Sequence, residues 1–515
     1  MSETHETKPV EEIWTKIRNP DFEHLRTKYP EIIGQYFTDN NEDDRNTNSS
    51  LTNATSGSSD IYNQDEQSME PGSRFVFSTQ SNYVLTELLA KEYLGLDLLL
   101  DRTYLCPRLG NRMAYIIWVH ALLERPNLQS ESRGVVRGLD VGTGASCVYP
   151  LIATSLYENW HMLGTDLSKD SIQHARKQLD RNPRLAERVV IKQCERKSDG
   201  FFFFTNSTEG SDENDDWKDL DFVVCNPPFY ESPEELTEAR QQKQGEASTE
   251  LQARDHELYT DGGEYEFVKS LIDQSFTHHK QQQNHLRRSC WYTAMINKKS
   301  NLSDLIKHIK LVHTASAANY VVHDLDTGSR TQRWTLGWNW GWCRAPYAAS
   351  HSVTLKNVNP DPVQLIVPVT PPTPSAATVA SGANRDDNTP ALLDILIEKL
   401  EKELEQLDYI SLDLLPPLLG TSNKTHAPGK AWILEVKGDV WSRAYRRRQL
   451  KRQKTGDNAQ EDSSEAVETI LRIELLGNAD GGEAGPKLQV DWIYGREYKV
   501  FESFTTMIKR KLEAA

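Results

Sequence analysis

The chain lacks paired cysteines, a long apolar run and a surplus of positive charge, and each absence excludes a class of protein. Its six cysteines lie far apart in 515 residues. Without a Cys-x-x-Cys pattern or a nearby pair of histidines, they indicate a reducing compartment and no structural zinc. No run of about eighteen apolar residues exists and the first residues are polar, so we expect neither a membrane span nor a secretory signal.

The formal net charge of -16 at pH 7 excludes a protein that simply coats a polyanion with its whole surface. It leaves room for a local basic groove, because the acidic residues are concentrated in polar segments that cannot build a core. The hydrophobic content is 37%. A chain of this length and composition can form two domains and still contain a considerable amount of irregular chain.

A short apolar strand ends abruptly in Asn226-Pro227-Pro228-Phe229. Two prolines cannot extend a central strand, so the chain must leave the sheet in a rigid, extended turn. In open α/β sheets, ligands bind at the carboxyl ends of the strands. The Asn226 amide oxygen, the Pro227 carbonyl and the Phe229 ring would suit a planar amine there. A strand followed by a proline-rich turn with a buried phenylalanine fits the same residues.

A glycine-rich turn follows another predicted strand about eighty residues upstream, the separation that a few βαβ units occupy. Its glycines let the backbone turn tightly and approach a ligand without an intervening Cβ. About twenty residues later a strand ends in Asp166, where an acidic side chain meets ribose hydroxyls in nucleotide-binding crossovers. The residues of the turn are Asp140, Gly142, Thr143 and Gly144.

Together these motifs resemble the class I methyltransferases that use S-adenosylmethionine, and more narrowly the family that N6-methylates adenosine in U6 small nuclear RNA. A bacterial relative in that family acts on large-subunit ribosomal RNA. The similar blocks are 112–119, 140–150, 226–229, 262–269 and 327–334, with 19–22 and 28–30 near the amino terminus. The chain departs from the family at Asp166, where animal enzymes have Glu, and at 193–197, which is too divergent to assign a cofactor contact.

The resemblance implies S-adenosylmethionine as the cofactor and an adenine as the methyl acceptor. The glycine turn would admit the methionine part, Asp166 would bind the ribose, and Arg112 would hold the carboxylate. Arg112 fits equally well as a helix-surface arginine. Asn226 and the carbonyl of Pro227 would bind both N–H groups of the adenine amine and expose its lone pair to the methyl group. Phe229 would then stack on the flipped base.

Other activities fit part of the same pattern. Guanine-N2 methyltransferases of ribosomal RNA and glutamine methyltransferases of release factors use the same tetrapeptide, because each acceptor is a planar amine or amide. A ribosomal-RNA base methyltransferase, acting at adenine-N6 or guanine-N2, is therefore one alternative. A non-catalytic RNA-binding protein that retains the methyltransferase fold is another, although the intact glycine turn, Asp166 and Asn226 argue against it.

The predicted fold class is α/β, a Rossmann-like methyltransferase sheet with a small helical amino-terminal piece and a separate small α+β carboxyl-terminal domain. The helical piece comprises 1–38 and 75–133, the methyltransferase core 134–345, and the RNA-binding accessory domain 391–515. We expect helices at 85–100 and 115–123 in the first and strands at 431–436, 469–476 and 488–494 in the last. In the core, Ser168 is expected to cap a helix at 169–179. A disordered insertion is predicted at 39–74 from its Asn-, Asp- and Ser-rich composition, and a linker at 346–390.

A helix predicted at 440–454 is strongly basic, with Trp441 and Tyr445 interleaved. Its charged residues are Arg443, Arg446, Arg447, Arg448, Lys451, Arg452 and Lys454. Such a cluster suits phosphate backbones, but a nuclear-import signal or a solvated face would have the same composition. We expect a monomer that binds structured RNA, with U6 small nuclear RNA implied by the resemblance. We expect no metal and no membrane partner, and place the protein in the nucleus, with the cytoplasm as a second location.

Overall fold

The computed structural model describes most of the chain. The described residues are 9–39, 73–124, 134–206, 217, 219–242, 252–281, 290–313, 318–325, 332–370, 389–415, 430–447, 450, 468–476 and 485–514. Four members of the predicted basic helix lie outside them, namely Arg448, Lys451, Arg452 and Lys454. Most of the predicted insertion (40–72), part of the predicted linker (371–388) and the start of the last similar block (327–331) also lie outside.

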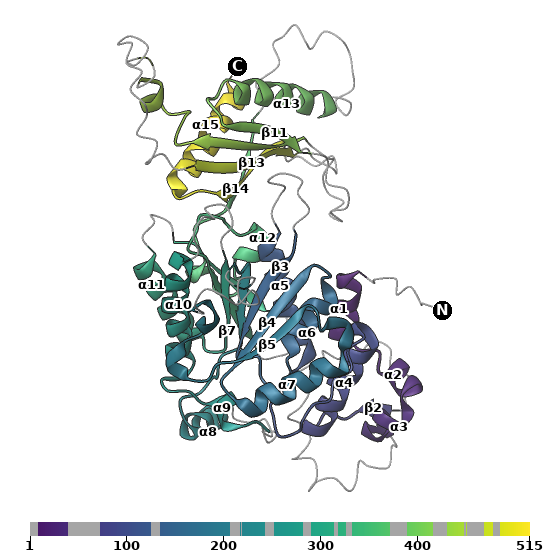
Figure 1. Cartoon of the computed structure of the whole chain (residues 1–515). Helices are drawn as coiled ribbons and strands as arrows, with labels where there is room; N and C mark the ends of the chain where they lie inside the picture. Colours follow the sequence, from purple (N-terminus) through teal and green to yellow (C-terminus); the bar gives the residue numbers. More distant parts are fainter. Residues whose placement is uncertain are drawn as a thin grey trace.

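A seven-stranded sheet forms the centre of the larger domain, in the order β5-β4-β3-β6-β7-β9-β8 (Figure 1). Neighbours from β5 to β7 are parallel, whereas β9 runs antiparallel to both β7 and β8. The strands are β3 (Val136–Val141), β4 (Trp160–Asp166), β5 (Val189–Gln193), β6 (Phe222–Cys225), β7 (Trp291–Ile296), β8 (Tyr320–Leu325) and β9 (Arg333–Trp338). The chain order reverses between β3 and β6, which is where such sheets bind ligands.

Helices pack on both faces of this sheet, because its strands are apolar on both sides. Met162 and Val224 belong to one buried cluster, with residues of α5 (Leu109–Leu123), α6 (Val148–Leu156) and α7 (Lys169–Arg181). Their neighbours Leu163 and Val223 belong to the opposite cluster, with α10 (Gly263–Gln281) and α11 (Lys299–Val312). This alternation is what a parallel sheet with covered faces requires. The α/β class predicted from the sequence is confirmed.

The amino-terminal helical piece differs in detail from the sequence prediction. An amphipathic helix predicted at 85–100 is instead α4 (Thr79–Leu94), which is buried on most sides. It begins at a Ser78 capping box and ends at Gly95 in a left-handed conformation, and these caps override the apolar pattern. The smaller elements here are α1 (Val10–Arg18), α2 (Phe22–Lys28), α3 (Pro30–Ile33), β1 (Phe37–Asp39) and β2 (Ser73–Phe75). Because β1 pairs with β2, the two ends of the predicted insertion are strand residues.

A second, five-stranded antiparallel sheet forms the carboxyl-terminal domain, in the order β10-β14-β13-β12-β11. The prediction of three strands is therefore corrected to five. Its elements are β10 (Gln364–Pro368), α13 (Thr389–Glu405), β11 (Ser411–Leu415), β12 (Ala431–Lys437), β13 (Glu468–Leu476), β14 (Lys487–Tyr494) and α15 (Tyr498–Glu513). The two helices cover one face through Leu396, Leu400, Phe501 and Phe504.

The predicted linker also needs correction, because β10 lies inside 346–390 and is an edge strand of the second sheet. Pro368, the last residue of β10, made this segment resemble a linker in the sequence, although edge strands tolerate proline. The α12 helix (Tyr347–Ser350) packs on α5, where its Ala349 carbonyl accepts the Trp118 indole N–H at 2.9 Å. Residues 346–370 therefore connect two packed domains. Among the described residues, no helix has both the length and the apolar character that a membrane span needs.

The two domains meet through Trp342–Arg344, just after β9. Cys343 pairs with Tyr494 in an antiparallel bridge, the Arg344 amide donates to the Ile493 carbonyl at 2.9 Å, and the Gly495 amide donates to the Trp342 carbonyl at 3.1 Å. Because Trp338 pairs with Tyr292 at the start of β7, this junction lies at the amino edge of the parallel strands. Figure 1 shows the second sheet beyond that end, away from α8 (Pro233–Gln242) and α9 (Asp255–Leu258).

Candidate active site

The glycine turn forms directly after β3, at the carboxyl edge of the sheet. Gly142 and Gly144 have φ of +74° and +63°, and a Cβ at either position would meet no atom within 4 Å. Thr165 of β4 fixes the turn, because its carbonyl accepts the amides of Gly142 at 2.9 Å and Thr143 at 2.8 Å. The backbone is therefore held open toward the space above the strand ends, as a ligand-binding turn requires.

Asp140 and Thr143 place buried oxygens at this turn. Neither carboxylate oxygen of Asp140 nor the Thr143 hydroxyl has a hydrogen-bond partner within the described part of the chain. Burial raises the pKa of the Asp140 carboxyl to about 7, opposed first by the neighbouring Thr143 side chain and then by the charge of Arg112. A buried acid without a donor is costly, so these atoms indicate a site that expects a ligand with hydrogen-bond donors or positive charge.

Asp166 stands at the end of the adjacent strand and ties the two turns together. Its carboxylate accepts the Gly144 amide at 3.0 Å and the Ser168 amide at 2.8 Å. Burial raises the pKa of this carboxyl, and the two amide donors act in the opposite direction. Each oxygen keeps a further lone pair that a hydroxyl can use. Ser168 also caps α7 by accepting the Ser171 amide, as the sequence predicted.

Arg112 lies on the first turn of α5, which begins six residues earlier than the helix predicted at 115–123. Its Nη1 donates to the Tyr149 hydroxyl at 2.7 Å, and its guanidinium lies 5.2 Å from the Tyr149 ring centre. Its Nε is buried and has no partner among the described residues. Arg112 is therefore not a helix-surface arginine, because one side of it is packed and the other keeps a free donor.

Asn226-Pro227-Pro228-Phe229 follows β6 at the same edge. Asn226 is half-buried, yet its Oδ1 is fully buried and has no hydrogen-bond partner in the described structure. Pro227 is buried, while Pro228 and Phe229 are half-buried. The register pairs Val141 with Cys225, so Asn226 begins one residue past the end of β3. The structure therefore brings the tetrapeptide beside the glycine turn, as the two motifs predicted.

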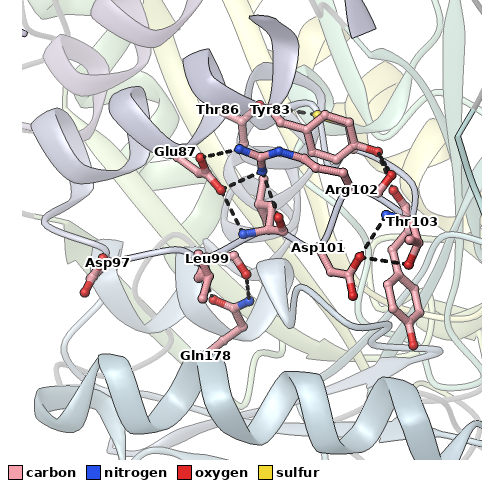
Figure 2. A network of polar contacts seen from close by, with 12 residues as sticks. Tyr83, Thr86, Glu87, Asp97, Leu99, Asp101, Arg102, Thr103 and Gln178 are labelled. Carbon is pink, nitrogen blue, oxygen red and sulfur yellow. Dashed lines mark hydrogen bonds and ion pairs between the residues drawn. The ribbon is translucent and has the colours of Figure 1, made fainter. Parts of the chain in front are cut away.

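A chain segment between α4 and α5, residues 95–108, covers the outer side of the glycine turn. Figure 2 shows the polar network that holds it, in which Arg102 pairs with Glu87 at 2.7 Å and Gln178 of α7 accepts the Leu99 amide at 3.0 Å. A small cavity between this segment and the turn is lined by Tyr83, Tyr104, Ala145, Ser146 and His174, among others. Sequence reasoning missed this cover, because its contacts come from residues distant in the chain.

Arg333 is a second site residue that sequence reasoning did not select, although it lies in one of the similar blocks. It starts β9 at the carboxyl edge, and its guanidinium lies 6.0 Å from the Phe229 ring centre. Burial and the nearby charge of Arg108 lower its pKa to about 10. Lys298 lies close by, 5.6 Å from the Tyr230 ring centre and paired with Glu235. Arg333 therefore places a positive charge beside Phe229.

The predicted RNA-binding residues lie apart from this site, in the carboxyl-terminal domain. Arg443, Arg446 and Arg447 are exposed on a helical segment. Trp441 is buried against Phe504 at 5.0 Å between ring centres, so it belongs to the core of that domain. No group of three or more His, Cys, Asp or Glu side chains is arranged to hold a metal in the described part of the chain.

Comparisons with known proteins agree with this geometry. A family model described as RNA methyltransferase matches residues 79–341, just over half of the chain. The chain belongs to this RNA methyltransferase family. It is an RNA methyltransferase by that membership, and the matched span contains the glycine turn, Asp166 and Asn226.

The chain is similar to proteins from fungi, bacteria and animals. The U6 small nuclear RNA (adenine-(43)-N(6))-methyltransferase of Schizosaccharomyces pombe is 26% identical over 428 residues, which cover 80% of this chain and 91% of the relative. Ribosomal RNA large subunit methyltransferase F of Flavobacterium johnsoniae is 30% identical over 248 residues, or 46% of this chain and 73% of the relative. The amino-terminal domain of human METTL16 in complex with SAH is 25% identical with a TM-score of 0.43, covering 63% and 96% of the two chains.

Proposed function

We propose that this RNA methyltransferase transfers the methyl group of S-adenosylmethionine to N6 of an adenine in structured RNA, with U6 small nuclear RNA as its substrate. The observation that carries the proposal is the buried, unpartnered Oδ1 of Asn226 beside the unpartnered oxygens of Asp140 and Thr143. The names of relatives from Schizosaccharomyces pombe, Dictyostelium discoideum and Drosophila melanogaster support the substrate.

The residues of the glycine turn fit the cofactor. S-adenosylmethionine supplies an electrophilic methyl group on a sulfonium. Asp140 would face its positive charge, Arg112 its carboxylate and Asp166 its ribose hydroxyls. Gly142, Thr143 and Gly144 would line its approach, because no Cβ intrudes at the two glycines. Each assignment gives a partner to a side-chain atom that is otherwise unpaired or has a free lone pair.

The tetrapeptide would position the base. The exocyclic nitrogen of adenine is a poor nucleophile because its lone pair is delocalised into the ring. Asn226 Oδ1 and the Pro227 carbonyl would accept its two N–H groups and draw the nitrogen toward tetrahedral geometry. Phe229, whose ring lies 6.0 Å from the Arg333 guanidinium, would stack on the flipped base. Positioning of this kind can supply several kcal/mol of the barrier.

Incubation with labelled S-adenosylmethionine and a U6 small nuclear RNA transcript, followed by nucleoside analysis, tests the proposal. We expect label in N6-methyladenosine, and a rate of labelling on the order of 100- to 1,000-fold lower when Asn226→Ala replaces the wild-type chain. A parallel reaction with total RNA asks whether ribosomal RNA is preferred. Label in N2-methylguanosine, or in no nucleoside of either RNA sample, would contradict the assignment.

The accessory domain, assembly and location complete the proposal. Exposed Arg443, Arg446 and Arg447 would contact RNA phosphates together with the basic residues that follow. A nuclear location follows from the substrate named for the relatives. We propose a monomer, which sedimentation of the purified chain can test, and cell fractionation can test the location.

A further inference from the structure

The strand that carries Asn226 is held unequally on its two sides. Along β6, four residues pair with β3, from Phe222 with Gly138 to Cys225 with Val141. Only the first two pair with β7, Phe222 with Trp291 and Val223 with Tyr292. Along its other edge, β7 stays paired with β9 from Tyr292 to Ile296. The two central strands therefore separate at their carboxyl ends, just before the catalytic tetrapeptide.

Two buried hydroxyls occupy the space where the ladder stops. Thr293 of β7 donates its hydroxyl to the Val223 carbonyl at 2.6 Å. The Tyr115 hydroxyl from α5 lies 2.7 Å from the Thr293 hydroxyl, and the Cys225 amide donates to the Tyr115 hydroxyl at 3.4 Å. Tyr115 and Thr293 are both fully buried. Tyr115 takes up the Cys225 amide, which lies beyond the last β6 residue that pairs with β7, and Thr293 joins the Tyr115 hydroxyl to the Val223 carbonyl.

The direction of each hydrogen bond in this series can be assigned by counting donors. Each hydroxyl has one hydrogen. Since Thr293 gives its hydrogen to the Val223 carbonyl, Tyr115 must donate to Thr293 and accept from the Cys225 amide. All the hydrogen bonds of the series therefore donate in one direction, from the Cys225 N–H to the Val223 carbonyl. Such a buried, fully satisfied network fixes a single arrangement of the groups in it.

We propose that Tyr115, acting through Thr293, is a positioning residue for methyl transfer, because it fixes the end of β6 from which Asn226 presents its amide oxygen. Cys225 is the residue directly before Asn226, so the bond to its amide restrains the backbone that carries the acceptor. This inference rests on the role proposed for Asn226. It assigns no contact between Tyr115 and either substrate.

Helix α5 thereby serves both halves of the reaction. Arg112 and Tyr115 are three residues apart, so they lie on one face of the helix. The Tyr115 ring packs edge-on against Tyr149 at 5.5 Å between ring centres, and Tyr149 accepts the bond from Arg112. The ring of Tyr115 thus supports the side proposed for the cofactor, and its hydroxyl supports the side proposed for the base. A substitution that keeps the ring and removes the hydroxyl therefore separates the effect on the cofactor side from the effect on the base side.

Tyr115→Phe is that substitution, and Tyr292→Phe is its matched control. Tyr292 is also fully buried and bonds through its hydroxyl, but to His278 of α10 on the other face of the sheet. We expect Tyr115→Phe to lower kcat on the U6 transcript about 10- to 100-fold, as a misplaced reacting group does, with the Kd for S-adenosylmethionine changed less than about threefold. Tyr292→Phe should lower the thermal midpoint comparably and leave kcat within about threefold.

Hydrogen exchange provides a readout that does not depend on the RNA chosen. Peptides spanning 222–230 should exchange faster in Tyr115→Phe than in wild type or Tyr292→Phe. Thr293→Val should give the same pattern, and the double variant should be no worse than either single variant, because both break one network. Unchanged exchange at 222–230 would overturn the positioning role. Faster exchange in Tyr115→Phe with no methylation even by wild type would instead count against the proposed substrate.

Discussion

Buried polar groups at the two edges of the central sheet differ in whether they have hydrogen-bond partners. At the carboxyl edge, buried atoms of Arg112, Asp140, Thr143 and Asn226 have no partner among the described residues. At the amino edge, Arg344 is buried too, but its Nε and Nη2 both donate to the Gly495 carbonyl, at 3.2 and 2.9 Å, and its guanidinium stacks on Trp492 at 4.0 Å. Within the described residues, the carboxyl edge therefore leaves these buried polar atoms without a partner, whereas the Arg344 guanidinium at the amino edge is hydrogen-bonded.

This contrast separates function from stability within one domain. An unpartnered buried acceptor costs folding free energy, roughly 1–3 kcal/mol for each group. Such a cost persists where the group acts on a ligand. A satisfied network stabilises the fold and gives a ligand nothing to bind. Substitutions at the carboxyl edge should therefore affect catalysis more than stability, and substitutions at the amino edge should do the reverse.

Asn226→Ala is the strongest test of the first half of this contrast. Loss of the acceptor should lower kcat on the order of 100- to 1,000-fold, the range measured when one group that stabilises a transition state is removed. The Kd for S-adenosylmethionine should stay within a few-fold. The free energy of unfolding should stay the same or rise by up to about 1 kcal/mol, because an unpaired oxygen disappears. Turnover near that of wild type would exclude the role assigned to Asn226.

Asp140 should make cofactor binding depend on pH. Burial raises the pKa of its carboxyl to about 7, so the acid is largely protonated below that pH when no ligand is bound. A cationic donor favours the ionised form. The Kd for S-adenosylmethionine should therefore tighten by up to about tenfold per pH unit as pH rises toward 7, and level off above it. Calorimetric titration between pH 5 and 8 measures this, with Asp166→Asn to isolate the contribution of the other buried acid.

The same carboxyl has a stability signature of opposite sense. Its folded pKa lies above the ordinary value of 3.8. The folded state therefore holds the proton more tightly, and this contribution to stability is complete below about pH 4 and lost as pH rises to about 7. The loss should amount to about 2–4 kcal/mol in the absence of a ligand. Asp140→Asn should remove that slope and weaken donor binding, and a variant that retains the slope would contradict the assignment.

Local sequence patterns could predict which residues gather at the carboxyl edge of the sheet. Gly142, Asp166 and Asn226 each stand at the end of a strand that short apolar runs already indicate, and parallel strands bring their ends to one edge. The helix boundaries were less accurate, because Ser78 and Gly95 set α4 by capping rather than by apolar spacing.

Long-range partners were beyond local pattern. Tyr115 and Thr293 are 178 residues apart, and no spacing rule links an interior helix residue to one threonine of a distant strand. The same holds for Arg344, whose partners Trp492 and Gly495 belong to another domain. The strands β10 and β11 were missed because edge strands need only one partner and tolerate polar residues and proline.

Arg344→Ala tests the amino edge. The truncation leaves the Gly495 carbonyl buried without its donor and opens a space over Trp492, which should cost about 2–4 kcal/mol. Arg344→Lys keeps the charge but lacks the planar guanidinium, so its stability should lie between those of the wild type and Arg344→Ala. Limited proteolysis between the domains and thermal unfolding measure the loss. Methylation of a short hairpin should change less than about threefold, since Asn226 lies at the other edge; a large fall in that rate would break the contrast.

The smallest expected effect concerns the accessory domain. Reversing Arg446, Arg447 and Arg448 to Glu should weaken RNA binding and flatten the log–log salt dependence. The slope should fall by roughly 0.9 for each phosphate that the protein no longer neutralises, by analogy with B-DNA. Arg446 and Arg447 are exposed, and Arg448 lies outside the described residues. KM for the U6 transcript should rise, while kcat at saturating RNA should change little.

The placement of the two edges sharpens this prediction further. The six residues of β9 alone separate them by about 20 Å at 3.3 Å per residue. An RNA must extend beyond that length to reach Asn226 and the accessory domain together. The triple variant should therefore raise KM for a full-length transcript and leave KM for a short hairpin unchanged, whereas Asn226→Ala should lower kcat on both RNAs on the order of 100- to 1,000-fold. If affinity and salt dependence for the long RNA stay at wild-type values, the basic helix is an import signal or a solvated face, and RNA binding lies wholly at the carboxyl edge.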